Sequence, residues 1–448
     1  MRRAWCVIAT VWCAASFSAS AQNWPSWRGA EAAGIGAGSP PLTWDLAKKE
    51  NVAWKQAIPG LGLGSPIVWG DRVYITTAVP MAGDAPLQIV NDNVTLAKGE
   101  QEHAWRLYAL DRKTGRILWE RTVHQATPRG ARHVKASHAN ATPVTDGKIV
   151  VARMGVEGIF AFDRNGKQLW KHILDAPGEQ DRYDQANSLV IYRNLVILQD
   201  DHYRGGSSLT AFDLKNGRIV WREARAEGHA CSTPTIFPAR RKGERDLLVT
   251  QTGRFIRGID PATGKGIWLI RQDEAHTRFD RIPAPIAAGD FILISGGSPT
   301  SPVFAIRRTA TGDITLPVGA TQNEHIAWTV TTSGAYMPSP IVVGDLFYVL
   351  RVNGAFGAYR VATGEMVYQQ RLGEGGYFTA SPVAARGHIY VINDDGEVFI
   401  VRAGEKLDVA QRHSLGEMCF VTPALSGDLL LLRTRHNVYG IATAGIAR

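Results

Sequence analysis

A repeated hairpin constrains the fold of this chain more than any other feature. Residues 107–119 read LYALDRKTGRILW, in which a short alternating strand leads into a tight turn and then into a second strand that ends at Trp119. The carboxylate of Asp111 can accept hydrogen bonds from the turn amides, and Gly115 can adopt the positive φ that such a turn requires. Related hairpins recur at residues 158–170, 209–221 and 256–268. This recurrence predicts an architecture assembled from copies of one small unit.

Two landmarks in the sequence, one at the start and one at the end of each unit, give the number of units. Each unit opens with a strand that starts at a small residue, usually Ser or Thr before proline, and eight such openings occur near residues 65, 142, 188, 233, 284, 339, 381 and 422. Each unit closes with a strand that carries a bulky residue, first Trp119 and finally, in degenerate form, Val409. The eighth opening has no closing strand after it. A spare strand around Asn51 to Lys55, before the first opening, can supply the missing one.

Eight openings and eight closings describe a closed ring. Each unit contains four short strands, so we expect an all-β, eight-bladed β-propeller of four-stranded antiparallel blades, with the last blade completed by the N-terminal strand. A solenoid is the alternative, but an open stack needs no strand from the opposite end of the chain. The expected organisation is a signal peptide (1–21), an extended segment (22–50) and a single propeller domain (51–448). The bulky residue of each closing strand is expected to wedge against the next blade.

The N-terminus indicates export. Arg2 and Arg3 precede an apolar stretch from Ala4 to Phe17, and small residues at 19–21 form a cleavage site. The apolar run is too short to span a bilayer, and Cys13 follows Trp12 rather than the small residue of a lipoprotein signal. We therefore expect a periplasmic or secreted monomer without a transmembrane segment.

The charge of the chain gives no indication of nucleic-acid binding. The formal net charge is +9 and falls to about +7 without the two arginines of the signal. The basic residues are spread along the sequence, whereas nucleic-acid binding calls for a clustered basic stripe. We expect no nucleic-acid partner.

The strand order places the long loops on one face of the ring. Connections between blades, and between the second and third strand of each blade, lie there, including an insertion over residues 80–103, so a site is expected on this face. Its predicted ligand-binding residues are Arg132, His133, Lys135, His138, Asn140, Asp181, Arg182, Tyr183, Asp184, Gln185, Asp201, His202, Tyr203, His229, Arg278, Asp280, Tyr336, Tyr377 and Phe378. A mouth that is polar on one half and aromatic on the other suits a ligand with a polar and an apolar end. The alternative is that these side chains satisfy loop backbone and hold channel water.

Metal and hydrolase motifs are weak or missing. His133, His138, His202 and His229 are scattered, and no tight motif such as HExxH, CxxC or GxSxG occurs. We expect no bound metal and assign no catalytic residue.

The hairpin pattern AFD-x-x-x-G-x-x-x-W, the Ser-Pro or Thr-Pro openings and the count of eight resemble the pyrroloquinoline-quinone-like (PQQ-like) repeat. That repeat occurs in quinoprotein alcohol dehydrogenases and in the outer-membrane assembly lipoprotein of the β-barrel machinery. The chain is also similar to exported bacterial PQQ-binding-like β-propeller repeat proteins, which begin with a WPxxRG segment like residues 24–29. The resemblance covers residues 23–442, and it implies the fold far more specifically than any activity.

The resemblance also raises quinone catalysis. Quinoprotein dehydrogenases hold PQQ between a Trp and a disulfide of two adjacent cysteines, with calcium bound by carboxylates and an Asp as base. Here only Cys231 and Cys419 follow the signal, in different blades. Asp181, Asp184 and Asp280 are the candidates to replace the base, and the sequence does not assign one of them.

We therefore expect a non-catalytic scaffold without a cofactor, which binds a protein segment or small molecule at the loop-rich face. The alternative is a quinoprotein-type oxidoreductase with PQQ and calcium. A third interpretation is a scaffold in an envelope complex, as in the assembly lipoprotein, against which the missing lipid-attachment cysteine counts.

Overall fold

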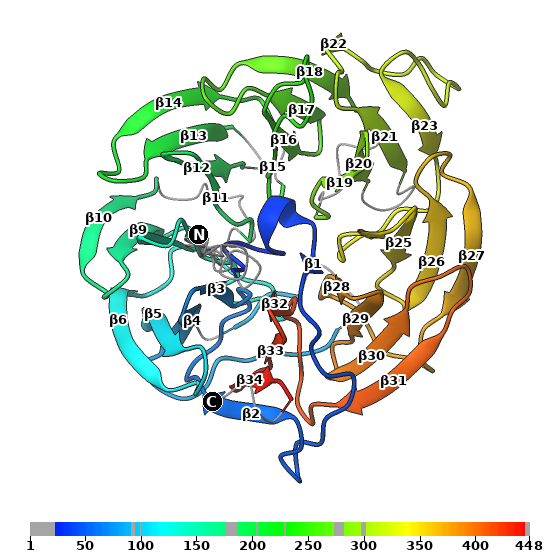
Figure 1. Ribbon diagram of the computed structural model, residues 1–448. Helices are drawn as coiled ribbons and strands as arrows, with labels where there is room; N and C mark the ends of the chain where they lie inside the picture. Colours follow the sequence, from blue (N-terminus) through cyan, green and yellow to red (C-terminus); the bar gives the residue numbers. More distant parts are fainter. Residues whose placement is uncertain are drawn as a thin grey trace, which may run out of the picture.

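Eight sheets surround a common axis in the computed structural model, which describes residues 23–90, 95–98, 100–175, 186–202, 205–227, 230–272, 282–296 and 302–443 (Figure 1). The arrangement is an eight-bladed propeller of antiparallel blades, as the sequence predicts. The predicted signal peptide lies outside the described residues.

The strands follow the predicted order, with the innermost strand of each blade directly after its opening residue. The first four blades are β3 (Ile67–Trp69), β4 (Arg72–Pro80), β5 (His103–Asp111) and β6 (Ile117–Ala126); β7 (Val144–Thr145), β8 (Ile149–Met154), β9 (Gly158–Asp163) and β10 (Gln168–Ile173); β11 (Val190–Tyr192), β12 (Leu195–Asp200), β13 (Ser208–Asp213) and β14 (Ile219–Ala224); β15 (Thr235–Phe237), β16 (Leu247–Gln251), β17 (Phe255–Ile259) and β18 (Gly266–Arg271).

The remaining blades repeat this plan. They are β19 (Ile286–Ala288), β20 (Phe291–Ser295), β21 (Val303–Arg307) and β23 (Ile326–Val330); β24 (Ile341–Val343), β25 (Leu346–Leu350), β26 (Ala355–Arg360) and β27 (Met366–Arg371); β28 (Val383–Ala385), β29 (His388–Ile392), β30 (Glu397–Arg402) and β31 (Val409–Ser414); β32 (Ala424–Ser426), β33 (Leu429–Arg433), β34 (Asn437–Ile441) and β2 (Val52–Ala57).

The last blade joins the two ends of the propeller. Strand β2 pairs antiparallel with β34, with Lys55 opposite Tyr439. The predicted donation of the strand around Asn51 to Lys55 is confirmed.

A tryptophan from each of five blades docks on the hairpin turn of the next blade. The indole nitrogens of Trp54, Trp119, Trp170, Trp221 and Trp328 donate to backbone carbonyls of that turn at 2.9–3.3 Å. The rings cover the turn glycines so closely that a Cβ on Gly115, Gly166, Gly217, Gly264 or Gly364 would lie 2.5–2.8 Å from the indole. The predicted wedge is therefore confirmed for these five blades, where the turn glycine is required by the contact as well as by its positive φ.

The junction between the fourth and fifth blades departs from this rule. The fifth hairpin is long, not short like the others, because residues 308–325 form an excursion that includes β22 (Gly312–Asp313). Strand β22 pairs in parallel with β18 and adds a fifth strand to the fourth blade. Trp268 then packs among apolar residues that include Ile306, Ala310 and Ile314 instead of on a turn glycine. Within the described part of the chain, its indole nitrogen has no hydrogen-bond partner.

A belt of hydroxyl groups ties the innermost strands together. The opening-residue hydroxyls of Thr142, Ser188, Thr233, Ser339, Ser381 and Thr422 each accept a hydrogen bond from the backbone N–H of the preceding blade's opening residue, at 2.8–3.0 Å. We call these six groups the hydroxyl belt. Ala284 has no hydroxyl to accept from Thr233, so the belt is interrupted between the fourth and fifth blades.

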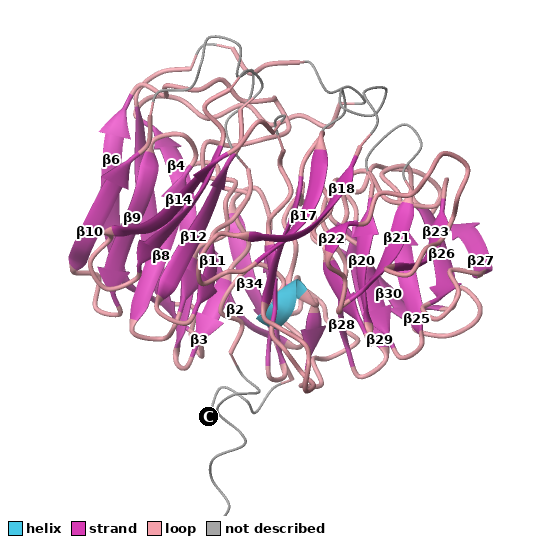
Figure 2. Cartoon of the chain, turned by 90° about the horizontal axis from the view of Figure 1, so that it is seen from above, coloured by secondary structure: helices cyan, strands magenta, loops and turns pink. Residues whose placement is uncertain are grey.

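The segment before β2 crosses the middle of the ring (Figure 1). Trp24 and Val68 exchange two backbone hydrogen bonds of 2.8 Å. The segment then forms the short helix η2 (Ala30–Ala32) and strand β1 (Ile35–Gly36), which pairs in parallel with β28. The helix lies toward the end of the ring away from the longer loops (Figure 2).

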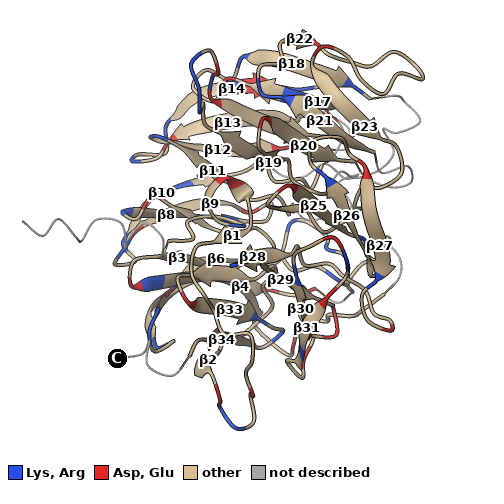
Figure 3. Ribbon diagram, turned by 45° about the vertical axis from the view of Figure 1, so that its right-hand side comes forward, with Lys and Arg blue, Asp and Glu red and all other residues tan. Residues whose placement is uncertain are grey.

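Acidic and basic residues are interspersed along the strands and loops of the blades (Figure 3). In the described part of the chain, no helix is long and apolar enough to cross a membrane.

Replacing Gly217 by alanine should destabilise the propeller more than the same change at Gly344. Both glycines have a positive φ, of 73° and 67°, but a Cβ at Gly217 would lie 2.6 Å from Trp170 whereas nothing lies within 4 Å of one at Gly344. Gly344→Ala should cost about 1 kcal/mol of unfolding free energy, and Gly217→Ala about 1–3 kcal/mol more. Chemical denaturation measures both, and equal losses would contradict the docking role of the glycine.

Extending the hydroxyl belt across the junction of the fourth and fifth blades should stabilise the ring. Ala284→Ser places an acceptor where the belt is interrupted, and one added hydrogen bond contributes about 1 kcal/mol. Ala287→Ser, at a partly buried position of strand β19, which follows Ala284 directly, is the matched control. Unfolding midpoints compare the two, and a gain no larger than that of the control would argue against the belt.

Candidate functional site

The axial channel contains a cavity of about 200 Å³. Trp27 of the N-terminal segment lines it, and the same indole also lines a second cavity of about 220 Å³ between that segment and blades 3 and 4. The walls of the channel cavity are the hydroxyl belt, Ser65, and residues of the blade connections, among them Leu63, Lys135, Asn140, Cys231, Met337, Thr379 and Phe420. Residues next to the inner strands and residues of the loop-rich face thus line the same small cavity.

Lys135 is the charged side chain of this cavity. It comes from the connection between blades 1 and 2 and reaches blade 7, where its ammonium lies 3.3 Å from the carboxylate of Asp394. The ammonium also lies 5.6 Å and 5.9 Å from the ring centroids of Tyr377 and Phe420, within the range of cation–π attraction. Together, the carboxylate and the two rings fix the ammonium at the cavity wall.

Asp394 is fully buried behind Lys135. The backbone N–H and the hydroxyl of Thr379 donate to its carboxylate at 2.8 and 3.0 Å. Burial raises the pKa of Asp394 to about 6, although Lys135 and Thr379 act in the opposite direction. The carboxyl group therefore gains a proton in mildly acidic solution, which leaves the charge of Lys135 uncompensated.

The insertion of the first blade (residues 80–103) is held in place by a cluster of charged side chains around Glu100. Glu100 lies 2.7 Å from the Nε of Arg132, and Arg132 also donates to the carbonyls of Pro86 and Ala136. His103 and His138 lie 3.6 and 3.5 Å from the same carboxylate. Burial alone would raise the pKa of Glu100, but His138 and Arg132 outweigh it and lower the pKa. Leu87 of the insertion packs with Phe420, so the insertion also forms part of the wall near the channel.

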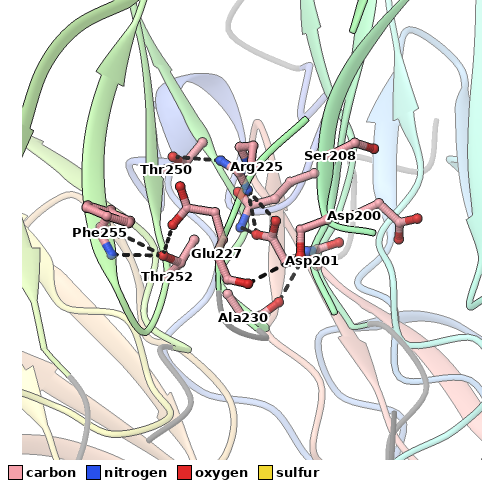
Figure 4. Close-up of polar contacts among 12 residues, drawn as sticks. Asp200, Asp201, Ser208, Arg225, Glu227, Ala230, Thr250, Thr252 and Phe255 are labelled. Carbon is pink, nitrogen blue, oxygen red and sulfur yellow. Dashed lines mark hydrogen bonds and ion pairs between the residues drawn. The ribbon is translucent and has the colours of Figure 1, made fainter. Parts of the chain in front are cut away.

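A second polar cluster lies between blades 3 and 4 (Figure 4). Arg225 contacts both carboxylate oxygens of Asp201, at 2.6 and 2.5 Å, and Arg153 contacts Asp200 at 2.7 Å. Burial raises the pKa of Asp201, whereas Arg153 and His202 lower the pKa of Asp200 to about 2 despite its burial. Glu227 is held in the same way by Arg257 and Thr252. These acids are neutralised by internal partners, as structural ion pairs are.

The structure distributes the predicted site residues over several places. Lys135 and Asn140 line the channel, and Tyr377 contacts Lys135. Arg132 and His138 take part in the Glu100 cluster. The backbone of His133 forms an isolated β-bridge with Leu96 of the insertion. Asp201 and His202 belong to the cluster between blades 3 and 4, and the partly buried Tyr336 precedes the channel residue Met337. Phe378 lies in the hydrophobic core beside Phe399, not in the channel.

The other predicted residues lie outside the described part of the chain. They are Asp181, Arg182, Tyr183, Asp184, Gln185, Tyr203, His229, Arg278 and Asp280.

Sequence reasoning missed the hydroxyl belt, Trp27 and Asp394 as parts of the channel. The belt residues were visible as strand openings, and their shared hydroxyl was the available signal. Asp394 stands in the turn sequence NDDGE, which resembles any other hairpin turn. Its pairing with Lys135 depends on loops from two different blades, so no local pattern reveals it.

The described residues do not fit the PQQ and calcium arrangement of the quinoprotein dehydrogenases. Cys231 and Cys419 are not joined to each other by a disulfide, and of the two only Cys231 lines the channel. Cys419 is fully buried, and burial raises its pKa to about 12. Within the described ranges, no group of three or more His, Cys, Asp or Glu side chains is arranged to hold a metal ion.

The Asp394 carboxyl group should make stability depend on pH between 4 and 6.5. Its folded pKa is raised, so its contribution is full below the ordinary pKa near 4 and is lost as the pH rises through about 6. The full loss corresponds to about 3 kcal/mol. Denaturation between pH 4 and 7 should show this extra loss in the wild type but not in Asp394→Asn. Parallel profiles of the two proteins would refute the raised pKa.

Known proteins resemble this chain at the level of the whole propeller. A family profile with the description "Outer membrane protein assembly factor BamB" matches residues 103–370. Tetrathionate hydrolase of Acidithiobacillus ferrooxidans is 23% identical over 367 residues, which cover 78% of this chain and 66% of the relative. Polyvinylalcohol dehydrogenase of a Sphingopyxis species is 22% identical over 378 residues, which cover 75% of this chain and 51% of the relative. The chain therefore spans less than two thirds of the length of either relative.

A solved structure agrees in fold. A europium-containing methanol dehydrogenase superposes with a TM-score of 0.68 at 14% identity, over 92% of this chain and 89% of the other. At that identity the likeness concerns the fold alone. The family profile covers more than half of the sequence. The chain therefore belongs to the PQQ-like repeat β-propeller family, whose profile carries the description of the assembly factor BamB.

Proposed function

We propose that this protein is an exported, non-catalytic scaffold that binds a ligand in its axial channel. The observation that carries the proposal is the channel cavity, which is bounded by Trp27, walled by the hydroxyl belt and equipped with one fixed cation, Lys135. Ligand sites are typically concave and contain a few convergent polar groups among apolar ones, and this cavity has that character.

Membership of the family establishes the propeller fold but does not indicate which activity the protein has. Its relatives are named as an assembly factor, a hydrolase and a dehydrogenase. One propeller thus carries unlike functions, and the function must be argued from the site. The acids of the described clusters favour a non-catalytic role, since Asp200, Asp201 and Glu227 are each engaged by an arginine.

A quinoprotein-type oxidoreductase is the second candidate. The dehydrogenase relative and the methanol dehydrogenase fold favour it. The wide separation of Cys231 and Cys419 in the sequence, in place of an adjacent pair, counts against it. Export rests on the N-terminal sequence, and placement in an envelope complex rests on the family description.

Filling the channel should abolish ligand binding. Ala136 lines the cavity, so Ala136→Phe should occupy it, whereas Ala320→Phe adds the same ring at an exposed position. Native mass spectrometry of protein purified from its own host should show a bound mass in the wild type and in Ala320→Phe, and none in Ala136→Phe.

Added PQQ and calcium should give no dye-linked oxidation of alcohols or sugars. Turnover under these conditions would overturn the non-catalytic assignment in favour of the oxidoreductase. Equal ligand occupancy in the two phenylalanine variants would place the binding site outside the channel.

A further inference from the structure

The described residues that line the channel cavity carry charge of one sign only. Lys135 is the cation among its described lining residues, and no Asp or Glu is among them. Asp394 neutralises part of this charge from behind, at 3.3 Å from the ammonium. A lysine ammonium has three donors, so contact with one carboxylate oxygen leaves others for the cavity.

The hydroxyl belt adds directed donors to this cation. All six belt residues line the cavity, and each hydroxyl oxygen already accepts one backbone N–H of the neighbouring blade. A hydroxyl group that accepts in this way still has its own proton to donate. The belt therefore presents several O–H donors to one small space around the axis.

Arg28 supplies a second positive charge close to the channel. Its side chain is fully buried, and none of its three guanidinium nitrogens has a hydrogen-bond partner in the part of the chain that the structure describes. The guanidinium carbon lies 5.6 Å from the ring centroid of Trp27, the residue that lines the channel. Burial lowers the pKa of Arg28 to about 9, so the group remains charged at neutral pH. A buried charge without a counter-charge is costly, and an anion nearby relieves that cost.

We propose that the channel ligand is a small oxyanion, of the size of sulfate, phosphate or a short carboxylate, held by Lys135 and the hydroxyl belt beside Trp27. The inference rests on the proposed function, namely that the channel takes a ligand. An oxyanion presents several acceptor oxygens to converging donors, which matches the belt, and its charge matches Lys135 and Arg28. A cavity of about 200 Å³ limits the ligand to a small molecule. A cationic ligand would meet like charge and no carboxylate on the described walls.

Selenate, which scatters anomalously and has the shape of sulfate, is the structural probe. Crystals of the wild-type protein soaked in millimolar selenate should show an anomalous peak in the channel, within hydrogen-bond distance of Lys135 and at least two belt hydroxyls. Crystals that hold selenate only at the surface, with water alone in the channel, would overturn the proposal.

Variants test the same site in solution. Calorimetry with sulfate at constant ionic strength should give a dissociation constant about tenfold or more weaker for Lys135→Met, because a charged hydrogen bond is lost. Lys135→Arg should retain most of the affinity. Lys215→Met, a change at an exposed turn on the opposite face, should leave the affinity unchanged. Unchanged affinity in Lys135→Met would overturn the proposal. If Lys135→Met does not fold, the double variant Lys135→Met with Asp394→Asn removes both members of the pair and must show the same loss.

Arg28 gives an independent readout. Bound sulfate should raise the unfolding temperature of the wild type, as any ligand of the native state does. In Arg28→Met this gain should shrink, while stability without sulfate should not fall, because the guanidinium has no hydrogen-bond partner to lose among the described residues and its burial as a charge is costly. An unchanged gain would contradict the role of Arg28.

Identification of the native ligand tests the oxyanion proposal separately from the proposed scaffold function. A neutral or cationic small molecule found in the channel by native mass spectrometry would overturn the oxyanion and leave the scaffold function intact. Turnover with PQQ and calcium would overturn the scaffold function whatever the sulfate measurements show.

Discussion

The ring depends on a tryptophan that lies flat on a glycine of the next blade. The turn glycine needs a positive φ and, at five junctions, also leaves the room that the indole occupies. The indole then donates to a carbonyl of the same turn. One short sequence motif thus specifies a local turn and a contact between blades. Since five of the eight junctions use the same contact, repetition of the motif fixes most of the ring.

The fold was predictable because its signals are local. A residue before proline, a turn glycine and a tryptophan each act within one hairpin, so counting them gave the number of blades and the donated strand β2. The fifth hairpin departed from the prediction because its turn is replaced by an excursion that adds β22 to the neighbouring blade. Trp268 kept its place in the sequence but lost the glycine on which the others dock, and no periodic pattern reveals such a loss.

The candidate site was less predictable because its contacts join distant loops. Lys135 and Asn140 were expected at the channel and do line it. Arg132 and Asp201 were expected there on charge alone, but both are engaged by buried partners. In the sequence Asp394 resembles an ordinary turn residue, and its pairing with Lys135 follows only from the position of blade 7 in the ring. Charge in a sequence indicates which side chains need partners, whereas the topology decides which partners they find.

The pairing of β2 with β34 has a consequence for how the chain folds. The first strand of the propeller finds its partner only when the last is present, so the closing contact joins residues such as Lys55 and Tyr439. Contacts so distant in sequence form late, because closing a large loop costs entropy before the contact stabilises it. While the chain is being made, the first seven blades can form only an open arc, in which the first and the seventh blade each lack a neighbour. In the closed ring, apolar side chains of these two blades, among them Val73 and Ile392, pack in one cluster with Leu430 of the last blade. The open arc therefore exposes hydrophobic surface, which favours aggregation, until the last blade is made.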